Sequence, residues 1–151
     1  MSVQRRKIGD REVYPIGLGC MNICHAYGPP LPEEEAKALL IRSLDLGYDF
    51  LDTATIYGVG RSEALIGEAL GHRRQEYFLA SKCVLDVRDG ERVLDGRPEA
   101  IKAACEASLK RLKTDVIDLD YLHRPDPNVP IEDSVGALAD LGAEGKIRFA
   151  G

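Results

Sequence analysis

Two patterns of apolar and polar residues alternate along the chain from about residue 14 onward. In one, apolar residues recur every three or four positions, which is typical of a helix with one buried face. In the other, short apolar runs are bounded by glycine, proline or charged residues, which indicates buried strands. The patterns predict strands over 14–21, 48–54, 77–84, 116–124 and 147–151, and helices over 32–47, 62–71, 98–115 and 130–146.

The predicted helices carry signals at their ends and along one face. Pro32 suits the first turn of the first helix, and Gly47 suits its C-terminal end. In the second helix we expect Ser62 as the N-cap and Gly71 as the C-cap. The apolar stripes expected to face the core are Ala36, Leu39, Leu40 and Leu44 in the first helix and Ile131, Val135, Leu138 and Leu141 in the last.

Regular alternation of strands and helices indicates right-handed βαβ units around a parallel sheet. The chain holds four such units and the start of a fifth strand, after a short hairpin expected to turn at Gly9 and Asp10. An open doubly wound sheet would carry a GxGxxG fingerprint after its first strand, and "GLGCMN" at 17–22 departs from it. The favoured class is therefore α/β of the (β/α)8 TIM-barrel type, with 1–151 as one domain. Segment 85–97 is expected to be a polar loop, solvated or part of a site.

Polar residues stand at the ends of three successive predicted strands. These are Asp52, Lys82 and His123, and Tyr57 follows in the loop after Asp52. Each alone has an ordinary explanation: a loop acid, a packed turn tyrosine, a strand-end lysine along apolar surface, or a core histidine. In a parallel barrel, however, strand ends converge on one mouth. A lysine that points into the barrel also needs a carboxylate partner, and Asp52 is one strand away.

These residues lie in motifs that resemble the aldo-keto reductases, nicotinamide-dependent carbonyl reductases with a (β/α)8 barrel. The resemblance covers essentially the whole chain. The motifs that carry it are "DTATIYG" at 52–58, "SEALIGEAL" at 62–70, "FLASKC" at 78–83 and "SLKRLKTDVIDLDYLHRPD" at 108–126. It implies a catalytic set of Asp52, Tyr57, Lys82 and His123.

The chemistry of these side chains agrees with the resemblance. Hydride addition to a carbonyl leaves an alkoxide that must gain a proton. A phenol with an ordinary pKa near 10 is a poor acid at neutral pH unless its phenolate is stabilised. The Lys82 ammonium would stabilise it, and Asp52 would keep that ammonium charged and oriented. His123 could donate a hydrogen bond to the substrate oxygen, while the hydride comes from a cofactor.

The resemblance also implies a cofactor and a pocket. The cofactor is NADPH, and the expected contacts are Gly19, Cys20, Met21 and Asp52. The expected pocket for a small carbonyl substrate is formed by His25, Tyr27, Tyr57 and His123.

Two departures from the family pattern stand out. Asp120 occupies a position where the family usually has an aromatic or aliphatic residue, and a buried carboxyl there needs a partner. The family barrel has eight units, whereas this chain stops in the fifth strand. We therefore expect a truncated half-barrel that lacks most of the cofactor site and self-associates through open edges. Its inner layer, including Phe50, Ala80, Leu119 and Tyr121, should be exposed.

Two other functions remain open at this stage. The chain could be a non-catalytic half-barrel remnant or interaction module. In that case a completed barrel would show no nicotinamide-dependent turnover. It could also be a Schiff-base aldolase that uses Lys82, which borohydride trapping with a carbonyl substrate would reveal.

Composition and charge narrow the classes of partner. The net charge is −5 with no basic stripe, which disfavours nucleic acid, and no apolar run approaches a membrane span. The basic N-terminus has no apolar segment behind it, so it is not a secretory signal. The four cysteines show no framework spacing and are expected to be reduced, which favours a cytoplasmic protein. The spacing of Cys20, Cys24, Cys83 and His25 matches no zinc pattern, so no metal is expected.

Overall fold

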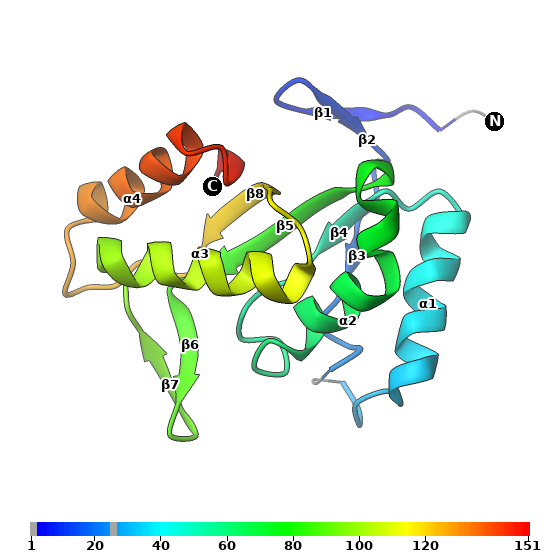
Figure 1. Cartoon of the computed structure of the whole chain (residues 1–151), viewed down its shortest axis with the longest axis horizontal. Coiled ribbons are helices and arrows are strands. Elements are labelled where there is room, and N and C mark those ends of the chain that lie inside the picture. The colour runs from blue at the N-terminus through cyan, green and yellow to red at the C-terminus, as the bar shows by residue number, and fades with distance from the viewer. Residues whose placement is uncertain (1–2, 25–26) are drawn as a thin grey trace.

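A five-stranded parallel sheet forms the centre of the structure, a computed structural model that describes residues 3–24 and 27–151 (Figure 1). Its spatial order, β3-β4-β5-β8-β9, is also the order along the chain. A doubly wound sheet would reverse its strand order at a switch point, whereas barrel strands follow in sequence. The predicted barrel-type α/β class is therefore confirmed. The strands are β3 (Leu18–Gly19), β4 (Phe50–Asp52), β5 (Phe78–Cys83), β8 (Ile117–Leu122) and β9 (Ile147–Ala150).

The helices pack against the sheet and bury its outer face. The largest apolar cluster combines residues from all four α-helices with Leu51, Leu79 and Ile117 of the sheet. Two hairpins lie at opposite ends of the sheet, β1–β2 at the top and β6–β7 at the bottom of Figure 1. The helices are α1 (Glu33–Asp45), α2 (Arg61–Leu70), α3 (Pro98–Leu112) and α4 (Ile131–Ala143), and a 3-10 segment, η1 (Gly71–Glu76), follows α2. None of the helices in the described part of the chain is both long and apolar enough to span a bilayer.

The inner face of the sheet is covered in part by the predicted N-terminal hairpin, β1 (Arg6–Ile8) and β2 (Arg11–Val13). Its turn residue Gly9 has a φ of +58°, and a Cβ at this position would lie 2.3 Å from the Phe149 ring. The cluster under the hairpin contains Ile8, Val13, Phe50, Phe78, Ala80, Leu119, Tyr121 and Phe149. The expectation that Ala80 and Leu119 are exposed was therefore wrong: they are 0% and 6% exposed, because the hairpin covers them.

Helix ends agree with the sequence in part. Gly47 follows α1 with a φ of +95°, and Gly71 is the C-cap of α2, as expected. Ser62, however, is not the N-cap. Gly60, with a φ of +85°, takes that place, and Ser62 lies fully buried in the first turn of α2.

The buried face of α4 differs from the predicted stripe. Ile131 and Val135 are each 48% exposed, and Leu39 on α1 is 40% exposed. The residues of α4 that face inward are Ser134, Ala137, Leu138 and Leu141. Both this set and the predicted stripe fit a helical period, and they share Leu138 and Leu141, so periodicity alone could not choose between them. Ser134 decides it, because its hydroxyl donates to the carbonyl of Gly96 at 2.6 Å.

The segment 85–97 is more ordered than the expected loop. It contains a hairpin of β6 (Leu85–Arg88) and β7 (Glu91–Leu94). Asp89 and Gly90 form its turn with φ values of +53° and +83°, the conformation that favours Asp-Gly in two-residue hairpin turns. The sequence carried this signal, but the polar composition of the segment concealed it.

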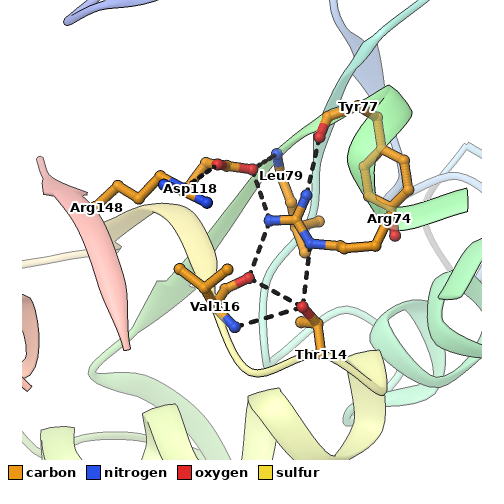
Figure 2. A network of polar contacts seen from close by, with 7 residues as sticks. All are labelled: Arg74, Tyr77, Leu79, Thr114, Val116, Asp118 and Arg148. Carbon is orange, nitrogen blue, oxygen red and sulfur yellow. Dashed lines mark hydrogen bonds and ion pairs between the residues drawn. The ribbon is translucent and has the colours of Figure 1, made fainter. Parts of the chain in front are cut away.

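The ends of the strands away from β6–β7 are fastened by one arginine (Figure 2). Arg74 donates to the Val116 carbonyl at 2.9 Å and to Asp118 Oδ2 at 2.6 Å. The same oxygen accepts the Leu79 N–H at 2.8 Å, and Arg148 Nε lies 2.9 Å from Oδ1. Asp118 thus joins β5, β8 and β9 and fixes the relative position of the strands that carry the candidate site.

Candidate active site

The predicted catalytic side chains come together at the C-terminal ends of three adjacent strands. Asp52 is the last residue of β4, Lys82 is the last but one of β5, and His123 directly follows β8. The N–H of His123 donates to the carbonyl of Cys83 at 3.1 Å, which extends the ladder beyond the strand.

The Lys82 ammonium is the centre of the group. Its Nζ lies 2.5 Å from Asp52 Oδ1, 2.8 Å from the Thr53 carbonyl and 3.2 Å from the Tyr57 hydroxyl. An ammonium has three N–H donors, and these three oxygens can accept all of them. The Lys82 side chain is only 14% exposed, so its charge is partly shielded from water and Asp52 balances it.

Tyr57 is placed by a tight series of turns. Its N–H donates to the Ala54 carbonyl at 3.1 Å, and the Gly60 N–H donates to the Thr55 carbonyl at 2.7 Å. Val59 has a φ of +54°, an uncommon conformation for a β-branched residue. The segment after β4 is therefore bent sharply enough to return the phenol to Lys82.

The His123 ring faces Tyr57 edge to face, with centroids 6.0 Å apart and planes at 86°. Burial lowers the pKa of His123, and the nearby Lys82 and Arg124 lower it further. A neutral imidazole is therefore the favoured form at neutral pH, and it has one N–H donor and one acceptor. Among the described residues Nδ1 is buried and has no hydrogen-bond partner.

Behind Asp52 lies a support that the sequence did not reveal. The Thr53 hydroxyl donates to Ser62 Oγ at 2.8 Å, and Ser62 Oγ donates to the Cys20 carbonyl at 3.0 Å. Thr53 and Ser62 are both fully buried. The pair links α2 to the ends of β3 and β4 and fixes the backbone whose Thr53 carbonyl binds Lys82. A serine at a helix start is ordinarily a cap, which is why its role was missed.

A second buried network lies on the helix side of β5. Ser81 Oγ donates to Glu63 Oε1 at 2.6 Å, and Arg111 Nε donates to Glu63 Oε2 at 2.7 Å. Asp120 is paired with Ser81 across the β5–β8 ladder and is 2% exposed. Burial, and then the charge of Glu63, raises the pKa of Asp120 to about 7, while a backbone hydrogen bond from Tyr121 opposes the rise.

The candidate cofactor residues are only partly gathered. Gly19 and Asp52 are register partners at the ends of β3 and β4, and a Cβ on Gly19 would meet nothing within 4 Å. The Cys20 thiol instead points into the core: it is fully buried, its Sγ donates to the Leu18 carbonyl, and burial raises its pKa to about 12. Met21 follows at intermediate exposure. The backbone of Cys20 is engaged as well, because its N–H donates to the Asp52 carbonyl at 2.8 Å and its carbonyl accepts from Ser62, so neither its side chain nor its backbone is open to a ligand.

The expected substrate residues are not all brought together. Tyr57 and His123 face each other, as described. Tyr27 is 90% exposed and lines a hollow of about 430 Å³ with Gly19 and Leu39, and none of the four catalytic candidates lines that hollow. His25 lies outside the described residues.

Comparison with known proteins identifies this arrangement. The sequence model described as "Aldo/keto reductase family" matches residues 15–151. The chain belongs to the aldo/keto reductase family. Its four candidate residues all lie in the matched part, as do the sheet and the helices.

Two curated aldo-keto reductases illustrate the relationship. A probable aldo-keto reductase of Glycine max is 38% identical over 153 residues, which cover 99% of this chain and 44% of the relative. An aldo-keto reductase of Schizosaccharomyces pombe, whose name includes NADP(+), is 43% identical over 155 residues, which cover 100% of this chain and 45% of the relative. The chain therefore spans about half the length of the curated relatives it matches.

Solved aldo-keto reductases share the fold. The holo form of an aldo-keto reductase from Bacillus halodurans has a TM-score of 0.88 and 34% identity, over 99% of this chain and 50% of that one. A glycerol dehydrogenase from Gluconobacter oxydans has a TM-score of 0.87 and 31% identity, over 100% of this chain and 48% of that one.

Proposed function

We propose that this chain carries the proton-transfer centre of an NAD(P)H-dependent reduction of aldehydes or ketones to alcohols. The observation that supports this most directly is the position of the Lys82 ammonium, 2.5 Å from Asp52 and 3.2 Å from the Tyr57 hydroxyl. Three groups are thus in contact in series. Tyr57 is the acid, Lys82 is the cation that stabilises its conjugate base, and Asp52 is the carboxylate that holds the cation.

The nicotinamide cofactor, when bound, supplies the hydride. Tyr57 is the proton donor to the oxygen of the reacting carbonyl, and Lys82 stabilises the phenolate that remains. His123, as a neutral imidazole, donates a hydrogen bond to the same oxygen and orients the carbonyl. Asp52 keeps Lys82 charged and prevents it from turning away from Tyr57.

The residues present fit one end of such a cofactor. The open space above Gly19, next to Asp52, leaves room for a flat ring at the mouth. Met21 would line it. As the sequence already indicated, "GLGCMN" after β3 lacks the GxGxxG phosphate fingerprint, so this chain offers the ring position rather than a diphosphate loop. NADPH is the proposed cofactor, in agreement with the NADP(+) in the name of the Schizosaccharomyces pombe relative.

The alternatives receive less support from the site. A Schiff-base aldolase needs a neutral lysine, and Lys82 forms an ion pair with Asp52 at 2.5 Å. A non-catalytic module would have no need of a partly buried ion pair beside a tyrosine and a histidine at the same strand ends. The substrate is a small carbonyl compound, in a pocket formed by Tyr57 and His123.

The test uses a completed barrel, in which residues 1–151 are fused to the remaining portion of the fission yeast relative. Tyr57→Phe in this protein is expected to abolish aldehyde reduction while the affinity for NADPH stays nearly the same, because only the phenol delivers the proton. Stopped-flow kinetics and cofactor fluorescence titration measure the two quantities. Turnover by Tyr57→Phe at the unsubstituted rate would remove Tyr57 from the mechanism. A completed barrel that binds NADPH but reduces nothing would favour the non-catalytic module.

A further inference from the structure

The β6–β7 hairpin is a large element at the site's end of the sheet, yet it supplies none of the four catalytic candidates. It begins at Leu85, three residues after Lys82, and projects beyond the strand ends (Figure 1). Its position raises the question of what it does for the site.

One face of the hairpin packs against the segment that carries Tyr57. Leu85 and Val87, two residues apart on β6, join Ala54, Ile56 and Tyr57 in one apolar cluster. Leu85 and Ile56 are each 8% exposed, and Ala54 is fully buried. The contact is therefore a closed apolar interface between the hairpin and the turn after β4.

The opposite face of the hairpin is packed less closely. Alternate residues of a strand point to opposite sides, so Asp86 and Arg88 face away from Tyr57. They line a cavity of about 240 Å³ together with the alanine-rich side of α3, and Thr55 and Leu85 border it as well. Because a cavity remains between the hairpin and α3, we infer that the apolar face with Leu85 and Val87 provides the contact that places the hairpin against the site.

The base of the hairpin is fixed at both of its ends. Val84, just before β6, has a φ of +76°, and its carbonyl accepts the N–H of Asp95 at 3.0 Å. The next N–H, from Gly96, donates to Asp126 Oδ2 at 3.0 Å, three residues after His123. The hairpin is thus anchored to the end of β5 and to the loop that follows His123.

The Tyr57 ring needs such a contact. Residues 53–60 belong to neither a helix nor a strand, and turn hydrogen bonds fix their backbone. Turn bonds leave the side-chain torsions of Tyr57 undetermined, so contacts made by its ring and hydroxyl must select its rotamer. Lys82 contacts the hydroxyl and the His123 ring faces the phenol, while Tyr57 and Val87 both pack against the cluster of Ala54, Ile56 and Leu85.

We propose that the β6–β7 hairpin is a positioning element for Tyr57, and that Val87 acts on the phenol through the apolar cluster of Ala54, Ile56 and Leu85, against which both side chains pack. Val87 acts only through the position of the tyrosine. The catalytic consequence rests on the proposed function, whereas the positioning itself can be measured without turnover.

The kinetic test compares two equal truncations of the same hairpin in the completed barrel. Val87→Ala should lower kcat about 10- to 100-fold with an unchanged KM for NADPH, because a displacement of about 1 Å at a reacting group can cost about 100-fold in rate. Val93→Ala, on the other face of the hairpin and of the same intermediate burial, should leave kcat unchanged. Val87→Ile, which keeps a branched apolar side chain at this position, should keep the rate of the unsubstituted protein. An unchanged kcat in Val87→Ala, or an equal fall in Val93→Ala, would overturn the proposal.

The second test reads the ring directly. The same proteins are labelled with 3-fluorotyrosine, and Tyr57→Phe identifies the fluorine resonance of Tyr57. Val87→Ala should shift and broaden that resonance, and Val93→Ala should leave it in place. If the completed barrel shows no turnover at all, the proposed function fails, but the fluorine spectra still decide the positioning. A Tyr57 resonance that is unmoved by Val87→Ala would overturn it.

Discussion

Lys82 is the residue on which the whole site depends. Its ammonium contacts Asp52, the Thr53 carbonyl and Tyr57, so one side chain couples the carboxylate to the phenol. Substitution of Lys82 should therefore affect Tyr57, the proton donor, directly. Substitution of Asp52 should affect only the orientation and charge state of Lys82.

Lys82→Met in the completed barrel should lower kcat about 100- to 1,000-fold at neutral pH, a loss similar to that caused by removing one preorganised electrostatic group. Asp52→Asn should be milder, because Lys82 keeps the Thr53 carbonyl and the Tyr57 hydroxyl. The double variant should be no slower than Lys82→Met alone, since the pair acts as one unit. Single-turnover rates of the three variants measure this, and fully additive losses would show that the two residues act independently.

At the same scale, sequence alone could place the four catalytic candidates, because strand ends in a parallel barrel converge and the motifs are specific. It could not place their supports. Ser62 carries the local pattern of a cap, and only the proximity of β3 and β4 in space makes it a partner of Thr53 and Cys20. Cys20 was likewise expected to contact a cofactor, but its side chain is buried in the main apolar cluster with the helices.

Among the elements, strand β8 holds two buried aspartates with opposite surroundings. Asp118 accepts hydrogen bonds from Leu79 and Arg74 and pairs with Arg148, whereas Asp120 is buried near Glu63. Burial and the charge of Glu63 therefore disfavour the charged form of Asp120, whereas Asp118 lies among hydrogen-bond donors and cations. Asp118→Asn and Asp120→Asn are therefore matched substitutions on one strand, with different surroundings.

The pKa of Asp120 in the folded chain, about 7, is higher than its ordinary value of 3.8. The folded state then holds a proton that the unfolded state has lost, so stability should fall as pH rises from about 4 to about 7. Asp120→Asn should remove this fall and raise the urea midpoint at pH 7. Asp118→Asn should instead destabilise the protein at pH 7, by up to about 3–5 kcal/mol, because it leaves Arg74, whose side chain is 12% exposed, without its carboxylate partner. Urea unfolding of both variants at pH 5 and pH 7.5 checks the two directions, and a pH-independent difference for Asp120→Asn would contradict the argument.

The order and type of the elements could be predicted from the sequence, because apolar residues recur every three or four positions in the helices and form short runs in the strands of the sheet. Two features could not. The inward face of α4 depends on Ser134, whose partner Gly96 is distant in sequence. The β6–β7 hairpin depends on an Asp-Gly turn inside a polar segment, where composition favours a loop.

For the whole molecule, the open edges of the sheet are the dominant feature. Within the described part of the chain, β3 and β9 each pair with a single neighbour in the sheet. The helices nearest these edges expose apolar side chains, Leu39 on α1 and Ile131 and Val135 on α4. Unpaired strand edges beside apolar surface favour pairing with another chain.

Residues 1–151 expressed alone should therefore self-associate or be marginally stable, and should bind NADPH weakly. Two copies would bring more strands than the eight of a family barrel, so edge-to-edge closure should give a mixture rather than one tight dimer. Light scattering with cofactor titration measures both properties. A monomer that binds NADPH tightly and reduces an aldehyde would contradict this expectation.

The N-terminal hairpin has a consequence for the way the chain is assembled. Gly9 lies against Phe149, so the β1–β2 hairpin completes its contacts on β9, which is synthesised much later. Each βα unit can add to its predecessor as it emerges, because the sheet follows chain order, but the contact between Gly9 and Phe149 must await residue 149. Contacts of such long sequence separation form slowly. The residues under the hairpin, including Val13 and Phe78, thus remain incompletely covered during synthesis, and the chain is most vulnerable to capture by other unfolded polypeptides in that interval.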